Sequence, residues 1–245
     1  MPDSALENQR VVVIGGSSGI GFAVAQRVLR EGAQVVIGSS SAARVEDAVK
    51  RLGAGASGSA VDVRDESSVA AFFAGSGPFD HLVYTAGDWD ALRRPGGVAE
   101  LDLAGANAIF TVRFWGALAA IKHAQGRISA QGSITLTDGA VAHRPRKGAA
   151  LNTAMAGAVE HLTRGLALDL APLRVNAVCP GLVLTEVWNS IPEDRREEQM
   201  RRMTARLLLP RVGMPEEIAE AYLYLIRGTY STGQVLIVDG GFTLA

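Results

Sequence analysis

The sequence has 245 residues, of which 48% are hydrophobic, and a formal net charge of −1 at neutral pH. This length and apolar content predict one domain, residues 1–245, with a single buried core. The near-neutral charge and the lack of a basic block argue against a nucleic-acid partner. The single cysteine, Cys179, excludes an internal disulfide framework and favours a reducing compartment.

The sequence carries no leader pattern at its N-terminus and no apolar run approaching the length of a membrane helix, about 18 residues. We therefore expect a soluble, cytoplasmic protein with no membrane partner. The His, Cys, Asp and Glu residues show no spacing typical of a metal site, so no metal is expected.

Strands and helices are predicted to alternate along the whole chain. The predicted strands are Arg10–Ile14, Gln34–Gly38, Gly58–Asp62, His81–Thr85, Gly132–Thr137, Arg174–Cys179 and Gln234–Asp239. The predicted helices are Ile20–Glu31, Ala43–Leu52, Glu66–Ala74, Leu101–His123, Ala149–Leu170 and Glu216–Arg227. This alternation predicts an α/β fold, a parallel sheet with helices on both faces and right-handed crossovers.

A glycine-rich turn follows the first predicted strand. Gly15 allows a sharp turn there, and Gly19 and Gly21 allow the backbone to approach a ligand closely. The next helix would point its free N–H groups and its positive dipole end at this turn, which suits a pyrophosphate. The alternative is an ordinary strand–helix turn without a ligand.

The second predicted strand is followed by Gly38-Ser39-Ser40-Ser41 and Arg44, with no acidic residue. An acidic side chain at this place would accept hydrogen bonds from the ribose hydroxyls of NAD. Hydroxyls and an arginine instead suit a 2′-phosphate, so NADP(H) is expected in preference to NAD(H). The alternative is a serine-rich helix cap.

Four further motifs follow at the expected intervals, namely Val61-Asp62-Val63-Arg64-Asp65, Tyr84-Thr85-Ala86-Gly87, the stretch 174–181 and the stretch 231–241. Together with the glycine-rich turn, they resemble the short-chain dehydrogenases/reductases over essentially the full chain. The resemblance implies a Rossmann-type, doubly wound sheet of seven strands that binds NAD(P)(H) and a small-molecule substrate. With the end of the second strand included, the expected cofactor contacts are Gly15, Ser17, Ser18, Gly19, Ile20, Ser39, Ser40, Arg44, Asp62, Val63, Thr85, Ala86, Gly87, Pro180, Gly181 and Thr185.

The resemblance breaks down at the family's catalytic residues. These are a Tyr, a Lys four residues later, a Ser thirteen residues before the Tyr, and an Asn on the preceding helix. With the alignment anchored on Ala156-Gly157, these positions hold Leu151, Met155, Asp138 and Arg113. No Tyr-x-x-x-Lys pair exists anywhere in the chain. A positioned acid or base contributes ~10²–10⁴-fold, so the family's usual mechanism is not expected here.

The substitutions suggest which residues carry a replacement chemistry. Arg113 and an ionised Asp138 are expected to form an ion pair in the vacated pocket, unless both face solvent or other partners. His143 is a second candidate, as a displaced proton donor beside Arg146 or Lys147, which would bind an anionic substrate. The alternative for this second group is a solvated basic loop.

The resemblance also implies a substrate lid at residues 182–212. Its apolar residues, Trp188, Met200, Met203 and Leu207–Leu209, are candidates for a wall of the substrate pocket, and core packing explains them equally well. Its charge run, residues 193–202, indicates a solvated helix face first and a substrate contact second. Tyr84 is a weaker alternative as proton donor.

The sequence therefore favours an NADP(H)-binding oxidoreductase with a non-standard site, acting on a substrate that needs little proton help, such as an activated enone or an iminium. The alternatives are a non-redox lyase, isomerase or cyclase, and a nucleotide-binding subunit or sensor without activity. The resemblance also implies a homodimer or homotetramer, since Phe114–Ile121 and Ala149–Leu170 match the two long helices that pair across the main family dimer. Four residues of the second helix are small enough for close helix approach: Ala154, Ala156, Gly157 and Ala158.

Overall fold

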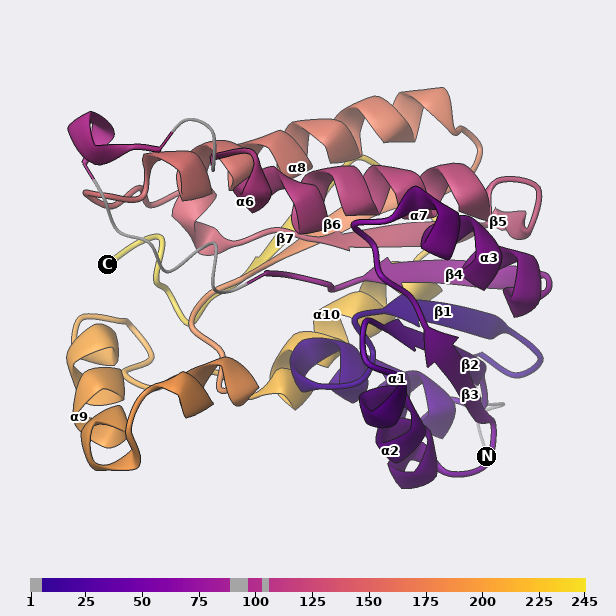
Figure 1. Cartoon of the computed structure of the whole chain (residues 1–245), viewed down its shortest axis with the longest axis horizontal. Helices are drawn as coiled ribbons and strands as arrows, with labels where there is room; N and C mark the ends of the chain where they lie inside the picture. Colours follow the sequence, from indigo (N-terminus) through magenta and orange to yellow (C-terminus); the bar gives the residue numbers. More distant parts are fainter. Residues whose placement is uncertain (1–5, 89–96, 103–105) are drawn as a thin grey trace.

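The computed structural model describes residues 6–88, 97–102 and 106–245. Its centre is a seven-stranded parallel sheet in the order β3-β2-β1-β4-β5-β6-β7 (Figure 1). The strands are β1 (Arg10–Ile14), β2 (Gln34–Ser39), β3 (Ala56–Ala60), β4 (Phe79–Tyr84), β5 (Ile128–Thr137), β6 (Arg174–Pro180) and β7 (Val235–Val238). The chain builds outward from β1 to one edge, then returns to β4 and builds to the other, which confirms the doubly wound α/β fold.

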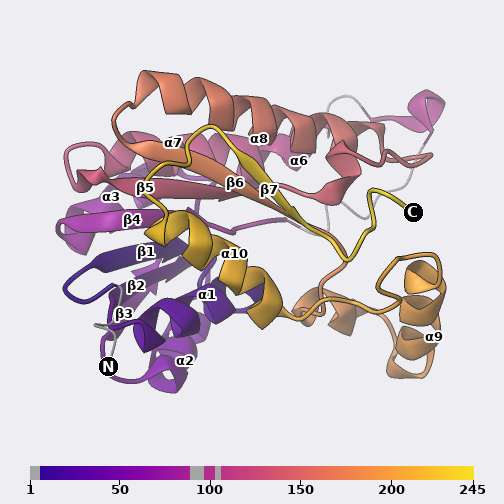
Figure 2. The same ribbon diagram turned by 180° about the vertical axis from the view of Figure 1, so that it is seen from behind.

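Helices cover both faces of the sheet. Figures 1 and 2 show α3, α7 and α8 on one face and α1, α2 and α10 on the other. Their bounds are α1 (Gly19–Arg30), α2 (Ala42–Leu52), α3 (Glu66–Ser76), α7 (Gly116–Ala124), α8 (Ala150–Asp169) and α10 (Pro215–Arg227). Each face has its own apolar cluster, one containing Ile37 and Tyr222 and the other Leu136 and Met155. No helix within the described residues has the length and apolarity needed to cross a bilayer.

Shorter elements connect these layers and differ most from the predicted ones. They are η1 (Val98–Glu100), α6 (Ala108–Phe110), η2 (Thr111–Trp115), η3 (Ala140–Ala142), η4 (Glu186–Ser190) and α9 (Glu193–Thr204). The predicted helix Leu101–His123 is wrong as one continuous α-helix, because its described part contains the π-helical turn η2 before α7; residues 103–105 lie outside the described chain. A π-turn inserts an extra residue into a helix and often marks a functional site. Arg113 lies at the centre of this one.

His81 is a polar side chain in the interior of β4, with 4% of its surface exposed. Its Nδ1 lies 2.8 Å from Ser133 Oγ and its Nε2 lies 2.7 Å from Gln9 Oε1. Burial lowers the pKa of His81 from 6.5 to about 4, because the imidazolium form loses its hydration. The ring is therefore neutral at physiological pH and links β1, β4 and β5 through hydrogen bonds.

We expect His81 to contribute to acid denaturation. The pKa of His81 is about 4 in the folded protein and 6.5 in the unfolded chain, so protons bind the unfolded chain preferentially as pH falls below 6.5. The free energy of unfolding of the wild type should therefore fall by about 2.5 kcal/mol more than that of His81→Gln between pH 7.5 and 4.5. Urea unfolding of both proteins at the two pH values measures this. Parallel losses in both proteins would contradict the assignment.

Candidate active site

At the carboxyl ends of β1 and β4, three chain segments lie so close together that no side chain fits between them. A Cβ atom on Gly15 would lie 2.6 Å from both Ala86 N and Thr85 Oγ1. A Cβ atom on Gly21 would collide with the Gly15 carbonyl oxygen and with Thr85 Oγ1. Gly15 also has a φ of +89°, which L-residues with side chains rarely adopt. The glycine pattern is thus required by packing at this turn.

A cleft of about 1150 Å³ opens at this end of the sheet. Its walls come from the loops that follow β1 to β6, from α8 and from the segment after β6. All of the residues expected from the sequence to contact a cofactor line this one cleft: Gly15, Ser17, Ser18, Gly19, Ile20, Ser39, Ser40, Arg44, Asp62, Val63, Thr85, Ala86, Gly87, Pro180, Gly181 and Thr185. Ligands of doubly wound sheets bind at this position, where the strand order reverses.

The N-terminus of α1 suits an anionic group. The helix begins at Gly19, the side chain of its N-cap residue Ser18 makes no capping hydrogen bond, and the first turn has no acidic residue. The first N–H groups of the helix and its positive dipole end therefore face the cleft with no acidic residue in the helix's own first turn, although the Glu186 carboxylate lies 3.3 Å from the Cβ position of Gly19. These features fit the pyrophosphate of a dinucleotide.

The serines after β2 divide between two roles. Ser39, Ser40 and Arg44 line the cleft, and the Arg44 Nη2 lies 3.4 Å from Ser40 Oγ. Ser41 instead caps α2, since its Oγ accepts a hydrogen bond from Arg44 N at 3.4 Å. The cap and the polar cleft wall predicted as alternatives are therefore both present, on neighbouring residues.

Arg64 is a cleft residue that the sequence analysis did not single out as part of the site. Its Nε and Nη2 donate to the two carboxylate oxygens of Asp62, each at 2.9 Å. Both residues line the cleft near Arg44, so this end carries two guanidinium groups and one carboxylate already engaged by Arg64. The signal in the sequence was the Asp62-Val63-Arg64 spacing, which places both side chains in one tight loop after β3.

Arg113 reaches the middle of the cleft. The residue is 8% exposed, and a Cβ atom on Gly87 would lie 2.9 Å from its Nη2. Its Nη1 donates to the backbone carbonyl of Asp138 at 3.3 Å. Burial lowers the pKa of Arg113, while the nearby Asp138 opposes that shift; an arginine remains charged at neutral pH in either case. A fixed positive charge with several donors thus lines the site.

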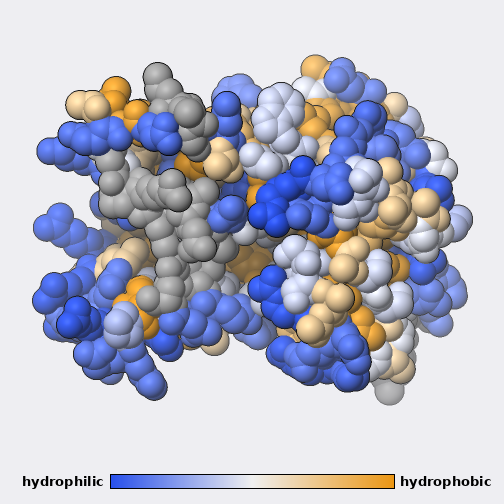
Figure 3. All heavy atoms as spheres, viewed as in Figure 1, coloured by the Kyte–Doolittle hydropathy of each residue, from blue (hydrophilic) through white to orange (hydrophobic). Residues whose placement is uncertain are grey.

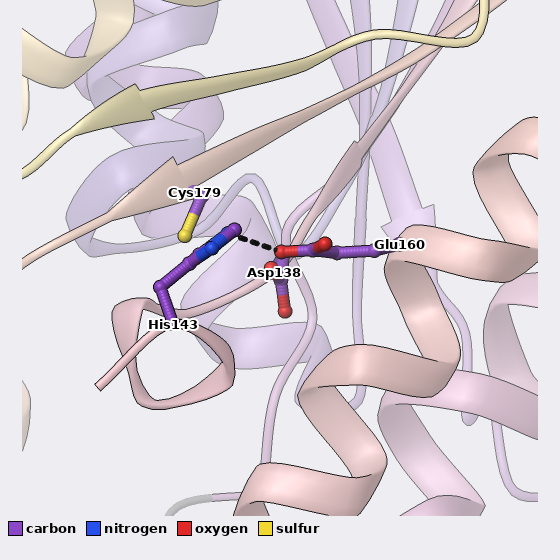
Figure 4. A group of neighbouring side chains, drawn as sticks. All are labelled: Asp138, His143, Glu160 and Cys179. Carbon is purple, nitrogen blue, oxygen red and sulfur yellow. Dashed lines mark ion pairs between the residues drawn. The ribbon is translucent and has the colours of Figure 1, made fainter. Parts of the chain in front are cut away.

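The predicted ion pair between Arg113 and the Asp138 carboxylate is not formed. Asp138 is 1% exposed, and neither of its carboxyl oxygens has a hydrogen-bond partner among the described residues. Its side chain enters a cluster with His143, Glu160 and Cys179, shown in Figure 4. Burial first, and then the neighbouring Glu160 carboxyl, raise the pKa of Asp138 to about 8. Desolvation and the Glu160 carboxyl therefore oppose the ionisation of Asp138 that the sequence analysis expected.

The family-model comparison covers almost the whole chain. Residues 14–243 match the model described as enoyl-(acyl carrier protein) reductase. The chain belongs to the short-chain dehydrogenase/reductase family. Members of this family are oxidoreductases that use a nicotinamide cofactor and small-molecule substrates.

Named relatives of this family match over nearly their whole length. The short-chain dehydrogenase/reductase ATR9 of Stachybotrys chlorohalonatus is 36% identical over 96% of this chain and 97% of its own. The solved MalC reductase/Diels-Alderase of Malbranchea aurantiaca has a TM-score of 0.91 and 33% identity, with 99% of each chain covered. A small-chain dehydrogenase solved in complex with NADPH has a TM-score of 0.83 and 35% identity, with 98% of this chain and 100% of that chain covered.

The register of α8 changes which residues face the cleft where this family has its Tyr and Lys. Asn152 and Ala156, four residues apart, line the cleft, as does Met155. Leu151 does not line it and packs against the apolar cluster on that face of the sheet. The alignment of Leu151 and Met155 with the family's Tyr and Lys stays a prediction, and Asn152 is a polar cleft residue that sequence reasoning missed. The absence of a cleft-facing Tyr and Lys is unaffected.

Two other suggested proton donors do not line the cleft. His143 does not line the cleft, and its Nε2 lies 2.6 Å from Glu160 Oε1. Tyr84 is 2% exposed and donates its hydroxyl to the Val112 carbonyl, and burial raises its pKa well above the ordinary value. Of the basic loop, Arg146 lines the cleft and Lys147 is exposed elsewhere.

The segment expected to be a lid forms one wall of the cleft. Trp188 is 7% exposed, lines the cleft and donates its Nε1–H to the Val183 carbonyl at 2.7 Å. From α9, Gln199 and Met203 line the cleft, whereas Met200 does not. The stretch Leu207–Leu209 is not part of this wall. The outer surface over α9 is hydrophilic (Figure 3), as its charge run predicts.

The glycine-rich turn makes a direct prediction. In Gly21→Ala the added methyl group meets backbone rather than a flexible side chain, so we expect a loss of about 1–3 kcal/mol in unfolding free energy and a clear loss of NADPH affinity. Gly75→Ala is the matched control, because nothing lies within 4 Å of its Cβ position. Chemical unfolding and cofactor-fluorescence titration measure both effects. Equal behaviour of the two variants would show that the turn tolerates a side chain.

Proposed function

We propose that this protein is an NADP(H)-dependent reductase in which Arg113 takes over the stabilisation of negative charge that a Tyr and a Lys provide elsewhere in the family. The observation that supports this proposal most directly is the position of the Arg113 guanidinium. It packs against Gly87 in a cleft that is also lined by the residues expected to contact a cofactor. Donors preorganised toward a developing oxyanion are typically the largest single contribution to such catalysis.

The cofactor would lie along the carboxyl ends of β1, β2 and β4. The N-terminus of α1 would hold its pyrophosphate, and Ser39, Ser40 and Arg44 its 2′-phosphate. The bound cofactor supplies a hydride. A hydroxyl pair and a guanidinium favour the additional phosphate of NADP(H) over NAD(H), and the NADPH complex of a relative 35% identical to this chain supports the same choice.

The substrate would be a hydride acceptor whose reduction does not require an acidic side chain of the protein to donate a proton. On an activated enone, Arg113 would donate hydrogen bonds to the carbonyl oxygen as enolate charge develops, and solvent would supply the proton. An iminium becomes a neutral amine on reduction, so it needs no acid, but it also develops no negative charge, and only the enone reaction is expected to depend on Arg113. Neither reaction requires Asp138 or His143 to act on the substrate: Asp138 lines the cleft but is 1% exposed, and His143 does not line it.

A non-redox cyclisation is the second candidate. The MalC protein, 33% identical with a TM-score of 0.91, is described as both a reductase and a Diels-Alderase. In such a reaction the cleft would hold a substrate in a reactive conformation and Arg113 would polarise a carbonyl group. The third interpretation, a nucleotide-binding subunit or sensor, stays a prediction from the sequence.

We also propose a homodimer or homotetramer, with α7 and α8 in the interface. Trp115 next to α7 is 59% exposed and Leu168 on α8 is 81% exposed, which is unusual for large apolar side chains. Ala154 is exposed on the same helix, but Ala156 is buried within the chain and does not serve close helix approach between subunits. A cytoplasmic location stays a prediction from the sequence.

Arg113→Ala should lower the turnover of enones by about 10²–10³-fold while NADPH affinity stays unchanged, because the change removes donors to the reacting oxygen but no cofactor contact. Arg113→Lys should recover part of this loss, since it keeps the charge without the planar fork. The assay follows NADPH oxidation and product formation with a panel of cyclic enones and iminium salts. Product formed without NADPH oxidation would support the cyclase instead. Full activity of Arg113→Ala on the enones would refute the assigned role.

Arg44→Ala should weaken NADPH binding by about 10–100-fold and leave NADH binding unchanged, because a charged hydrogen bond of about 1.5–3 kcal/mol is lost only with the phosphorylated cofactor. Lys50→Ala is the charge-matched control, since Lys50 lies on the same helix, pairs with Glu46 at 2.7 Å and does not line the cleft. Fluorescence titration measures both affinities. An equal loss for both cofactors would contradict a 2′-phosphate site.

A further inference from the structure

Four potential metal ligands meet beside the cleft, and one of them, Asp138, lines it. Asp138 follows β5, His143 follows η3, Glu160 lies on α8 and Cys179 lies on β6 (Figure 4). One ligand atom of each lies within 4.8 Å of the ligand atoms of the other three. The spacing of these four residues in the sequence did not predict a metal site, because they come from four separate elements that only the fold brings together.

The strongest indication of a missing partner is the Asp138 carboxyl group. The residue is 1% exposed, and neither oxygen makes a well-aligned hydrogen bond among the described residues, although the side chain points into the cluster beside the Glu160 carboxyl and the Cys179 thiol. A buried polar group without a partner costs about 1–3 kcal/mol. The adjacent Glu160 is 6% exposed, so a second carboxyl shares this dry environment. A cation between the two carboxyl groups would satisfy both.

We propose that Asp138, His143, Glu160 and Cys179 form a site for a divalent transition-metal ion of the Zn²⁺ type. A sulfur, an imidazole nitrogen and two carboxylate oxygens form a mixed ligand set that suits Zn²⁺ and Co²⁺ and does not suit Mg²⁺ or Ca²⁺, which prefer oxygen ligands. Four protein ligands would close the coordination sphere, as in structural zinc sites.

The geometry allows this coordination with small movements. The His143 Nε2 and Glu160 Oε1 lie 2.6 Å apart. Two ligands on a tetrahedral Zn²⁺ with bonds of about 2.0–2.1 Å lie roughly 3.3 Å apart, so the imidazole must move outward by under ~1 Å. The His143 side chain is 33% exposed, which gives it this freedom and gives an ion a route from solvent.

The surrounding charges also fit a dication. Two carboxylates and a thiolate carry three negative charges when ligated, and the ion neutralises two of them. Arg164 Nη2 lies 3.7 Å from Glu160 Oε2 and offsets the remainder. Coordination requires the ionised carboxylates and thiolate, so the protons held by Asp138 and Cys179 pass to solvent as the metal binds. The proposal does not depend on the proposed reductase activity.

Cobalt provides a specific test. Full-length protein without an affinity tag is treated with chelator, dialysed and titrated with Co²⁺ or Zn²⁺ alone. We expect one equivalent of Co²⁺ per chain, with the visible bands of a tetrahedral ion and a near-ultraviolet thiolate-to-cobalt band. Because Cys179 is the chain's single cysteine, that band can come from no other residue. Cys179→Ala should abolish it.

A pair of histidine variants separates this site from surface binding. His143→Ala should weaken Zn²⁺ binding at least about tenfold, measured by competition calorimetry, while circular dichroism confirms folding. His161→Ala is the control, since His161 is exposed on α8 and its Nδ1 bonds the Gly157 carbonyl at 3.0 Å. Absent or substoichiometric binding, a spectrum without the thiolate band, or equal losses in the two variants would overturn the proposal and leave the cluster as a proton-sharing carboxyl pair.

Discussion

The site depends on a close backbone approach at the centre of the sheet. Gly15 and Gly21 lie where a Cβ atom would collide with Thr85 or with backbone, so the ends of β1 and β4 meet with no side chain between them. This contact fixes the first turn of α1 and the start of the loop after β4, which together form the floor of the cleft. The strand order reverses at the same place, so the loops after β1 and β4 diverge above it and leave room for a ligand. The binding half of the site is therefore a consequence of packing as much as of ligand chemistry.

The other half of the site combines buried charges in an arrangement that hydrophobic packing alone would not produce. Arg113, Asp138 and Glu160 are each less than 9% exposed, and they come from η2, the end of β5 and α8. Burying a charge costs several kcal/mol unless another group compensates it. Arg113 obtains a carbonyl acceptor, Glu160 obtains His143 and Arg164, and Asp138 is driven towards its neutral form. Apolar side chains at these three positions would make the protein more stable. The buried charged groups of Arg113, Asp138 and Glu160 therefore indicate a role other than stability.

The sequence was sufficient for the fold, and the residues it predicts to contact a cofactor all line one cleft, because both follow from local patterns. Alternating apolar runs predicted every strand to within a few residues, and glycine spacing identified the turn. The catalytic half needed information that no local pattern holds. One residue of helical register decides whether Leu151 or Asn152 faces the cleft, and periodicity in an apolar helix such as α8 does not fix it. The ionisation of Asp138 depends on burial and on Glu160, 22 positions along the chain, so its sequence neighbours could not indicate it.

Asp138 connects the two halves of this unusual site. Its backbone carbonyl accepts the hydrogen bond from Arg113, and its side chain belongs to the cluster with His143, Glu160 and Cys179. Its backbone N–H also donates to the Val178 carbonyl at 2.9 Å, which ties it to β6 one residue before Cys179. The proposed ion would therefore be bound by the residue whose backbone carbonyl accepts the Arg113 hydrogen bond. Asp138 also lines the cleft, so its backbone carbonyl joins the cluster to the Arg113 guanidinium within the cleft wall.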